Sequence, residues 1–194
     1  MMEFKRNPSK MNLKKICLFC GSRAGLSQKW LLMARELGEK IGSKKWEVIY
    51  GGGRWGLMGE IAETAAETGS KVTGIITEEL LKLENTLQEI DELIIVRSMA
   101  ERKTKMIKIS DIFLVLPGGI GTLDELFEVW TTKQLKQHSK TIIILNFENY
   151  YDSLFRLIKN LVAEGFLVKP DKDSLIICQS VDEVISEISK NMLA

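Results

Sequence analysis

Several short apolar segments of this chain show no alternation of polar and apolar residues. The runs IFLVL (112–116) and TIIIL (141–145) are examples, and helical patterns separate such runs along the sequence. A strand without alternation must be covered on both faces, as happens in parallel sheets whose crossover helices pack on either side. The sequence therefore predicts an α/β fold: one doubly wound, Rossmann-like parallel sheet of about seven strands with helices on both faces.

Turn and cap signals set the expected limits of these elements. Ser27 is an expected helix N-cap, and Gly69 and Gly165 are expected to end helices, because glycine readily adopts the left-handed conformation found there. Residues 1–13 are expected to form a flexible tail before one domain spanning 14–194. Strands are expected at 15–19, 47–50, 71–76, 92–96, 112–116, 141–146 and 174–178, and helices at 28–42, 56–67, 99–110, 123–136, 151–164 and 182–190.

Charge and hydropathy narrow the classes of partner. The 27 Lys and Arg residues nearly balance the 26 Asp and Glu residues, a net charge of +1. This balance argues against binding to nucleic acid or to an anionic membrane through bulk charge. The sequence has no apolar run near the ~18 residues of a membrane span, and no signal-peptide core follows the charged start. We expect a soluble cytoplasmic protein.

Histidine and cysteine usage excludes further chemistry. His138 is the only histidine, so a zinc site with two histidines is impossible, and a Ser-His-Asp triad would have to use this residue. Cys17 and Cys20 form a CxxC, but they lie in the apolar run KICLFC rather than at a helix start, where a thiolate is stabilised. We interpret them as apolar residues of a buried strand.

The loop Pro117-Gly-Gly-Ile-Gly-Thr122 carries the strongest functional signal. It follows the strand IFLVL and opens a helix, and ligands of doubly wound sheets bind at the carboxyl ends of strands near a switch point. Glycines let backbone N–H groups and the helix dipole surround an anion, so the loop predicts a phosphate cradle. It lacks the lysine of a P-loop, so triphosphate hydrolysis is not implied. Thr122 and Glu125 also fit a capping box, which is the structural alternative.

Two other loops follow strands. Residues 51–59, GGGRWGLMG, contain GxGxxG, with Glu78 and Glu79 about 20 residues further on, as in a dinucleotide site. The motif follows the second expected strand rather than the first, and adjacent glycines also permit close backbone packing. The loop Cys20-Gly-Ser-Arg23 is most simply a strand-to-helix turn.

A basic run begins the helix expected after residue 98. It contains Arg102, Lys103, Lys105 and Lys108. An arginine there could grip a phosphate or carboxylate with its planar fork. Composition alone favours a solvated helix face.

The motifs GGGRWGLMG, MAERK and PGGIGTLDE resemble, in order and spacing, the signature of the LONELY GUY (LOG) family. Its members are cytokinin riboside 5′-monophosphate phosphoribohydrolases, often labelled lysine decarboxylase-like. The resemblance runs from about residue 16 to about residue 167 and implies that Arg102 and Glu125 are the catalytic pair. The substrate-binding positions that it implies are Glu84, Lys103, Gly118, Gly119, Ile120, Gly121, Thr122, Leu123, Asp124, Glu125 and Thr131, to which the loops add Ser22, Gly53 and Met99.

Four positions depart from the family pattern. Thr77 replaces a proline, and Ala100 stands where histidine is common. Thr132 and Lys136 replace a tryptophan and a glycine near the base pocket or a dimer contact. These departures concern the choice of base more than hydrolysis.

The resemblance implies hydrolysis of the N-glycosidic bond of a purine nucleoside 5′-monophosphate. Arg102 would anchor the phosphate, and Glu125 would stabilise a ribosyl oxocarbenium ion or activate water. The resemblance also implies a homodimer, and neither a metal nor a redox cofactor is required. Two alternatives stay open: a carrier of nucleotide or molybdenum cofactor that catalyses nothing, and a dinucleotide-dependent oxidoreductase.

Overall fold

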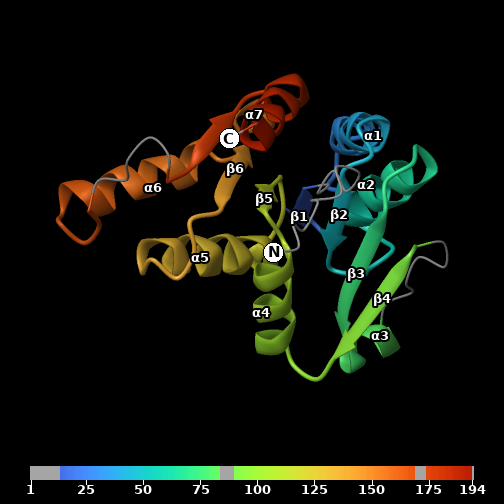
Figure 1. Cartoon of the computed structure of the whole chain (residues 1–194). Helices are drawn as coiled ribbons and strands as arrows, with labels where there is room; N and C mark the ends of the chain where they lie inside the picture. Colours follow the sequence, from blue (N-terminus) through green and yellow to red (C-terminus); the bar gives the residue numbers. More distant parts are fainter. Residues whose placement is uncertain (1–13, 84–89, 169–173, 194) are drawn as a thin grey trace, which may run out of the picture.

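Seven parallel strands form a single sheet in the computed structural model, which describes residues 14–83, 90–168 and 174–193 (Figure 1). The predicted tail, residues 1–13, lies outside the described residues. The strand order is β4-β3-β2-β1-β5-β6-β7, and every neighbouring pair is parallel. The strands are β1 (Lys15–Phe19), β2 (Glu47–Tyr50), β3 (Val72–Thr77), β4 (Glu92–Val96), β5 (Ile112–Val115), β6 (Thr141–Leu145) and β7 (Ile176–Cys178).

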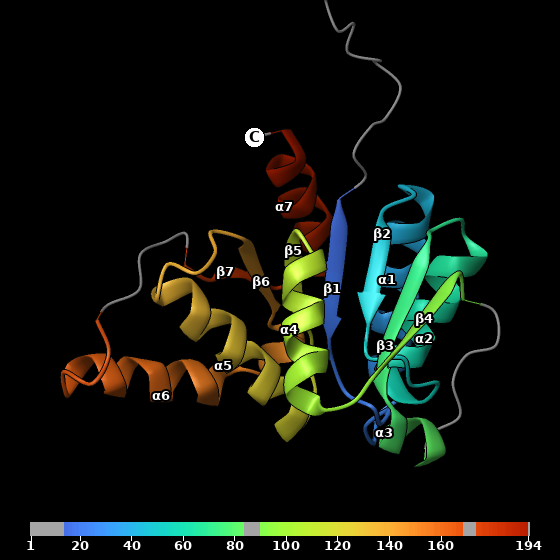
Figure 2. The same ribbon diagram turned by 60° about the horizontal axis from the view of Figure 1, so that its bottom comes forward.

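Helices cover both faces of this sheet, as the unalternating strands predicted. Helices α1, α2 and α7 lie on one face, and α4 and α5 lie on the other (Figures 1 and 2). Successive residues of β1 enter opposite cores: Cys17 packs on the α4 and α5 side, and Leu18 packs on the α1 and α2 side. The helices are α1 (Lys29–Ser43), α2 (Gly56–Glu67), α3 (Glu78–Leu83), α4 (Met99–Ile109), α5 (Ile120–Gln134), α6 (Asp152–Ala163) and α7 (Val181–Leu193), with a 3₁₀ turn at Phe147–Asn149.

The cap predictions have mixed outcomes. Gly69 and Gly165 follow helix ends with φ of 108° and 77°, which confirms their predicted role. Ser27 is not an N-cap: helix α1 begins at Lys29 with Gln28 in the cap position. The capping box is also wrong. Gly119 takes the cap position of α5, so the helix starts three residues earlier than expected and Thr122 lies inside its first turn.

The cysteine prediction is confirmed. Cys17 lies within β1, Cys20 follows that strand, and both are buried free thiols. Burial raises the pKa of both thiols well above its usual range, the reverse of an activated thiolate. None of the helices in the described ranges is long and apolar enough to cross a membrane.

The chain reverses the direction of strand addition at β1. Strands β2, β3 and β4 extend the sheet to one side of β1, and β5 begins the other side. The loops that leave β1 and β5 therefore diverge to opposite faces and leave a crevice at the carboxyl end of the sheet.

Candidate active site

A cavity of about 560 Å³ occupies this crevice. Most of its wall comes from the loops after β1, β2 and β5, together with the first turns of α2 and α4 and the first two turns of α5. Arg102 and Glu125 line it from facing helices. The cavity therefore joins three motif loops that are far apart in the sequence.

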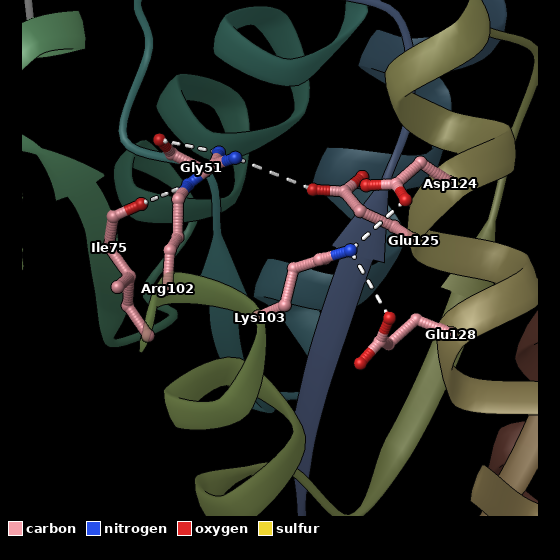
Figure 3. Close-up of polar contacts among 7 residues, drawn as sticks. All are labelled: Gly51, Ile75, Arg102, Lys103, Asp124, Glu125 and Glu128. Atoms are coloured by element: carbon pink, nitrogen blue, oxygen red, sulfur yellow. Dashed lines mark hydrogen bonds and ion pairs between the residues drawn. The ribbon is translucent and has the colours of Figure 1, made fainter. Parts of the chain in front are cut away.

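Arg102 is a buried cation held by backbone carbonyls (Figure 3). Its Nε donates to the carbonyl oxygen of Ile75 at 2.8 Å, and its Nη2 donates to that of Gly51 at 3.0 Å. A Cβ on Gly51 would lie 2.0 Å from Nη2, so glycine is required for this approach. The third guanidinium nitrogen, Nη1, faces the carboxyl group of Glu125. Arg102 is therefore buried and does not belong to a solvated helix face. A buried charge needs fixed hydrogen-bond partners, and the two carbonyls supply them.

Glu125 faces Arg102 from the second turn of α5. Its Oε1 lies 3.6 Å from Arg102 Nη1, and its side chain is 12% exposed. Burial raises the pKa of Glu125 to about 7, although the Arg102 charge acts in the opposite direction. A carboxyl group with a pKa near neutrality can accept or donate a proton at physiological pH.

Lys103, unlike Arg102, does not line the cavity and is paired with carboxylates of α5. Its Nζ donates to Asp124 Oδ1 at 3.0 Å and to Glu128 Oε2 at 3.2 Å (Figure 3). Successive helical residues point about 100° apart, which turns Lys103 away from the cavity that Arg102 lines. Lys103 thus ties α4 to the two carboxylates on either side of Glu125, and the solvated-face interpretation is wrong for it as well.

The glycine-rich loop contains one tightly packed glycine and two exposed ones. A Cβ on Gly118 would lie 2.2 Å from Thr122 Oγ1 and 2.8 Å from the nitrogen of Gly21. Gly119 and Gly121 are exposed, and a Cβ on either would meet no atom within 4 Å. The first N–H groups of an α-helix lack helical partners, so the start of α5 offers donors and a positive dipole end beside the cavity.

The glycines of residues 51–59 pack mainly against protein. A Cβ on Gly56 would lie 2.3 Å from the carbonyl carbon of Ser22, and one on Gly52 would lie 3.0 Å from Cβ of Ile76. These contacts favour the close-packing interpretation of the GxGxxG motif over a pyrophosphate site.

The structure brings together part of the predicted site. Eight predicted residues line the cavity: Ser22, Arg102, Gly118, Gly119, Ile120, Gly121, Thr122 and Glu125. Six described ones do not: Gly53, Met99, Lys103, Leu123, Asp124 and Thr131. Leu123 and Asp124 follow the rotation of α5 away from the cavity, and Thr131 lies exposed nearly two turns beyond Glu125. Glu84 lies outside the described residues.

Sequence reasoning missed the aromatic and apolar part of the wall. Trp30, Leu57, Met58, Leu80 and Tyr150 all line the cavity. Trp30 belongs to the apolar face of the first expected helix. Leu57 and Met58 lie in the motif GGGRWGLMG but were not assigned to the site, and Leu80 lies on the short helix α3, which was not predicted. Tyr150 belongs to no motif, so only the fold could place it here.

Sequence comparisons relate this chain to one family of known proteins. A family model described as "Possible lysine decarboxylase" matches residues 58–188. The cytokinin riboside 5′-monophosphate phosphoribohydrolase LOG1 of Arabidopsis thaliana is 40% identical over 175 residues, which cover 90% of this chain and 82% of that protein. The chain belongs to the LOG family. A second LOG relative, the cytokinin riboside 5′-monophosphate phosphoribohydrolase of Rhodococcoides fascians, is 35% identical over 90% of this chain and 89% of its own length.

Solved structures share the fold at lower sequence identity. The molybdenum cofactor binding protein from Rippkaea orientalis superposes with a TM-score of 0.69 at 21% identity, over 94% of this chain and 99% of that one. At this identity the likeness shows the fold alone. The predicted α/β class and the predicted LOG relationship are both confirmed.

Proposed function

We propose that the protein hydrolyses the N-glycosidic bond of purine nucleoside 5′-monophosphates, of the cytokinin type or AMP, to free base and ribose 5-phosphate. The observation that carries this proposal is the Arg102–Glu125 pair, 3.6 Å apart in the wall of a cavity that also contains the glycine-rich start of α5. The printed names of the LOG relatives support the same reaction.

The 5′-phosphate binds at the start of α5 in this proposal. Gly119 and Gly121 leave room for an anion, and the adjacent N–H groups and helix dipole favour its charge. The phosphate does not react, so its binding energy serves to hold the ribose in place for bond cleavage.

Glu125 then acts on the ribose. As a carboxylate it stabilises the cation that develops at C1′, and it accepts a proton from the attacking water. The C1′–N bond breaks with its electron pair going to the base, which takes up a proton on release. The pKa of about 7 leaves a large carboxylate fraction at neutral pH.

Arg102 has a modified role relative to the sequence prediction. Two of its nitrogens already donate to the carbonyls of Ile75 and Gly51, so the fork is not free to grip a phosphate with both arms. Nη1 alone faces Glu125. Arg102 thus orients the carboxylate and presents one N–H edge toward the substrate.

Release of free base from a panel of nucleotides tests the proposal. AMP, isopentenyl-AMP and the other common nucleoside 5′-monophosphates are incubated with the protein and analysed by chromatography, with adenosine as the matched compound without phosphate. We expect release from at least one purine monophosphate and little from adenosine. Binding of AMP without release would support the carrier alternative, and tighter binding of NAD(P) than of AMP would support the oxidoreductase.

We also propose that the protein is a homodimer, as the family resemblance implies, and that it is cytoplasmic, as expected from the sequence. Helix α6 supports a partner on its side of the molecule, since none of its residues is fully buried and Leu157 is exposed. Phe166 and Val168, just beyond the helix, are 84% and 87% exposed. Sedimentation analysis should give about twice the chain mass of 22.0 kDa.

A further inference from the structure

The turn between β6 and α6 contacts the glycine-rich loop through two consecutive tyrosines. The Tyr150 hydroxyl donates to the carbonyl oxygen of Gly118 at 2.7 Å, and the Tyr151 hydroxyl donates to that of Leu116 at 2.6 Å. The two bonds lie on either side of Pro117. This turn therefore fixes the loop that follows β5 from a part of the chain about 30 residues away.

The turn itself has an unusual and well-anchored backbone. Glu148 and Asn149 both adopt left-handed conformations, with φ of 55° and 59°. Such conformations are uncommon for residues other than glycine and persist where surrounding contacts hold them. Here Glu148 pairs with Lys29 at 3.2 Å, and the Asn146 side chain accepts from the nitrogen of Tyr151 at 2.7 Å.

Trp30 connects this turn to the cavity. Its ring makes edge contacts with Tyr150, at 5.6 Å between centroids, and with Phe147, at 5.9 Å. Gly25 packs against the same ring, where a Cβ would lie 2.7 Å from the indole. Trp30 and Tyr150 both line the cavity. The position of the Tyr150 hydroxyl is thus set by contacts with two other segments of the cavity wall.

We propose that Tyr150 is a positioning residue for the substrate phosphate, acting through the Gly118 carbonyl. A trans peptide is planar, so holding the carbonyl of Gly118 also fixes the direction of the Gly119 N–H in the same peptide unit. Two adjacent glycines would otherwise leave this unit free to rotate. Tyr150 thereby keeps the anion-binding donors in place before the substrate arrives, which lowers the cost of ordering them on binding.

Tyr151 provides a matched comparison within the same turn. Both hydroxyls donate to loop carbonyls, but Tyr151 is 3% exposed and binds Leu116 ahead of the glycines, whereas Tyr150 is 44% exposed and lines the cavity. The buried bond serves the stability of the fold, and the exposed one serves the geometry of the cradle. The inference rests on the proposed function, because it assigns the cradle to a sugar phosphate.

The variants Tyr150→Phe and Tyr151→Phe separate these roles. Both keep the ring and lose one hydrogen bond, a loss that corresponds to about a fivefold change in an equilibrium constant. For Tyr150→Phe we expect KM for the nucleotide, and the dissociation constant for ribose 5-phosphate measured by calorimetry, to rise about fivefold with kcat within about twofold and Tm nearly unchanged. For Tyr151→Phe we expect a lower Tm with KM and the ribose 5-phosphate affinity close to wild type.

Calorimetry distinguishes failure of this inference from failure of the proposed function. A wild-type protein that binds ribose 5-phosphate but releases no base would contradict the hydrolase proposal and still test Tyr150. Unchanged ribose 5-phosphate affinity in Tyr150→Phe, equal losses in both variants, or no binding by the wild type would overturn the positioning role.

Discussion

At the scale of single residues, Glu125 combines a chemical role with an environment that destabilises its charged form. Its carboxyl group is nearly buried beside one cation, and burial raises its pKa to about 7 from an ordinary value near 4.5. A carboxyl held in this way is poised for proton transfer but costs folding free energy whenever it is ionised. Its replacement should therefore separate activity from stability.

Glu125→Gln should remove most activity and leave nucleotide binding largely intact. Glutamine keeps the shape of the side chain but supplies no negative charge for a developing cation and no base for water. General-base and electrostatic contributions are worth roughly 100-fold or more, and we expect a loss in kcat of at least that size. Steady-state kinetics of base release measure it. Wild-type turnover in this variant would return Glu125 to a purely structural role.

The same variant should change the pH dependence of stability. Between pH 4.5 and 7 the unfolded chain has lost the Glu125 proton while the folded protein retains it, so this group stabilises the fold at low pH. That contribution is fully present below the unfolded pKa and is lost as pH rises through the folded pKa, and it amounts to about 3 kcal/mol. Denaturation at several pH values should show Glu125→Gln gaining on wild type as pH rises. Parallel profiles would contradict the raised pKa.

Arg102→Lys should not behave as a conservative change. A lysine cannot donate simultaneously to the carbonyls of Ile75 and Gly51 and still face Glu125, because it lacks the planar fork. We expect kcat/KM to fall at least roughly tenfold, or about 1.4 kcal/mol of transition-state stabilisation. Lys103→Ala is the matched control and should lose less, since its contacts are with Asp124 and Glu128 outside the cavity. A larger loss in Lys103→Ala would show that Lys103, and not Arg102, is the basic residue that supports the reaction.

Local sequence identified some of these residues and missed others for a physical reason. Pro117–Thr122 could be found because a glycine cluster between a strand and a helix has a local conformational meaning. The burial of Arg102 could not, since it depends on the carbonyls of Gly51 and Ile75, which lie 51 and 27 residues away. Tyr150 is recognisable only from its contact with Gly118, 32 residues earlier.

Among the helices and strands, the start of α5 shows how glycine position decides an element boundary. Local capping rules placed the cap at Thr122 and the first helical residue at Leu123, but Gly119 takes an extended conformation and lets the helix begin at Ile120. The boundaries of α2, β1, β2 and β4 agree with the prediction, because strong turn signals or abrupt changes in hydropathy mark them. Helix α3 was not predicted: it has six residues, too few for a helical period to be visible.

Gly118→Ala should destabilise the loop that leads into α5. The added methyl group would lie 2.2 Å from Thr122 Oγ1 and 2.8 Å from the nitrogen of Gly21, and the latter is rigid backbone. Overpacking of this kind costs about 1–3 kcal/mol in the free energy of unfolding. Gly121→Ala is the control, since no atom lies within 4 Å of its Cβ and alanine favours a helix over glycine by about 1 kcal/mol. Urea denaturation measures both, and equal effects would contradict the packing at Gly118.

For the molecule overall, strand order determines where the chemistry can occur. Arg102 is held by Gly51 and Ile75, which follow or lie in strands on one side of β1, whereas Glu125 and the glycine-rich loop follow β5 on the other side. The sequence predicted a switch point but not which loops flank it, because the pairing of β1 with β5 joins segments about 95 residues apart. A ligand in the cavity contacts both halves of the sheet and should stabilise the domain as a unit.

AMP should therefore raise the melting temperature, and adenosine should raise it far less. Measurement on Glu125→Gln avoids turnover during the experiment. At about 100 times the dissociation constant, a ligand that binds only the folded state adds about 2.7 kcal/mol to the free energy of unfolding. For a chain of this size that corresponds to a Tm increase of roughly 5–10 °C. Adenosine at the same concentration lacks the phosphate that the start of α5 would hold, so its Tm shift should be much smaller. In the double variant Glu125→Gln, Gly118→Ala, the Tm increase caused by AMP should be mostly lost. Equal shifts with AMP and adenosine would show that the cavity recognises the nucleoside alone, and the phosphate cradle would have to be abandoned.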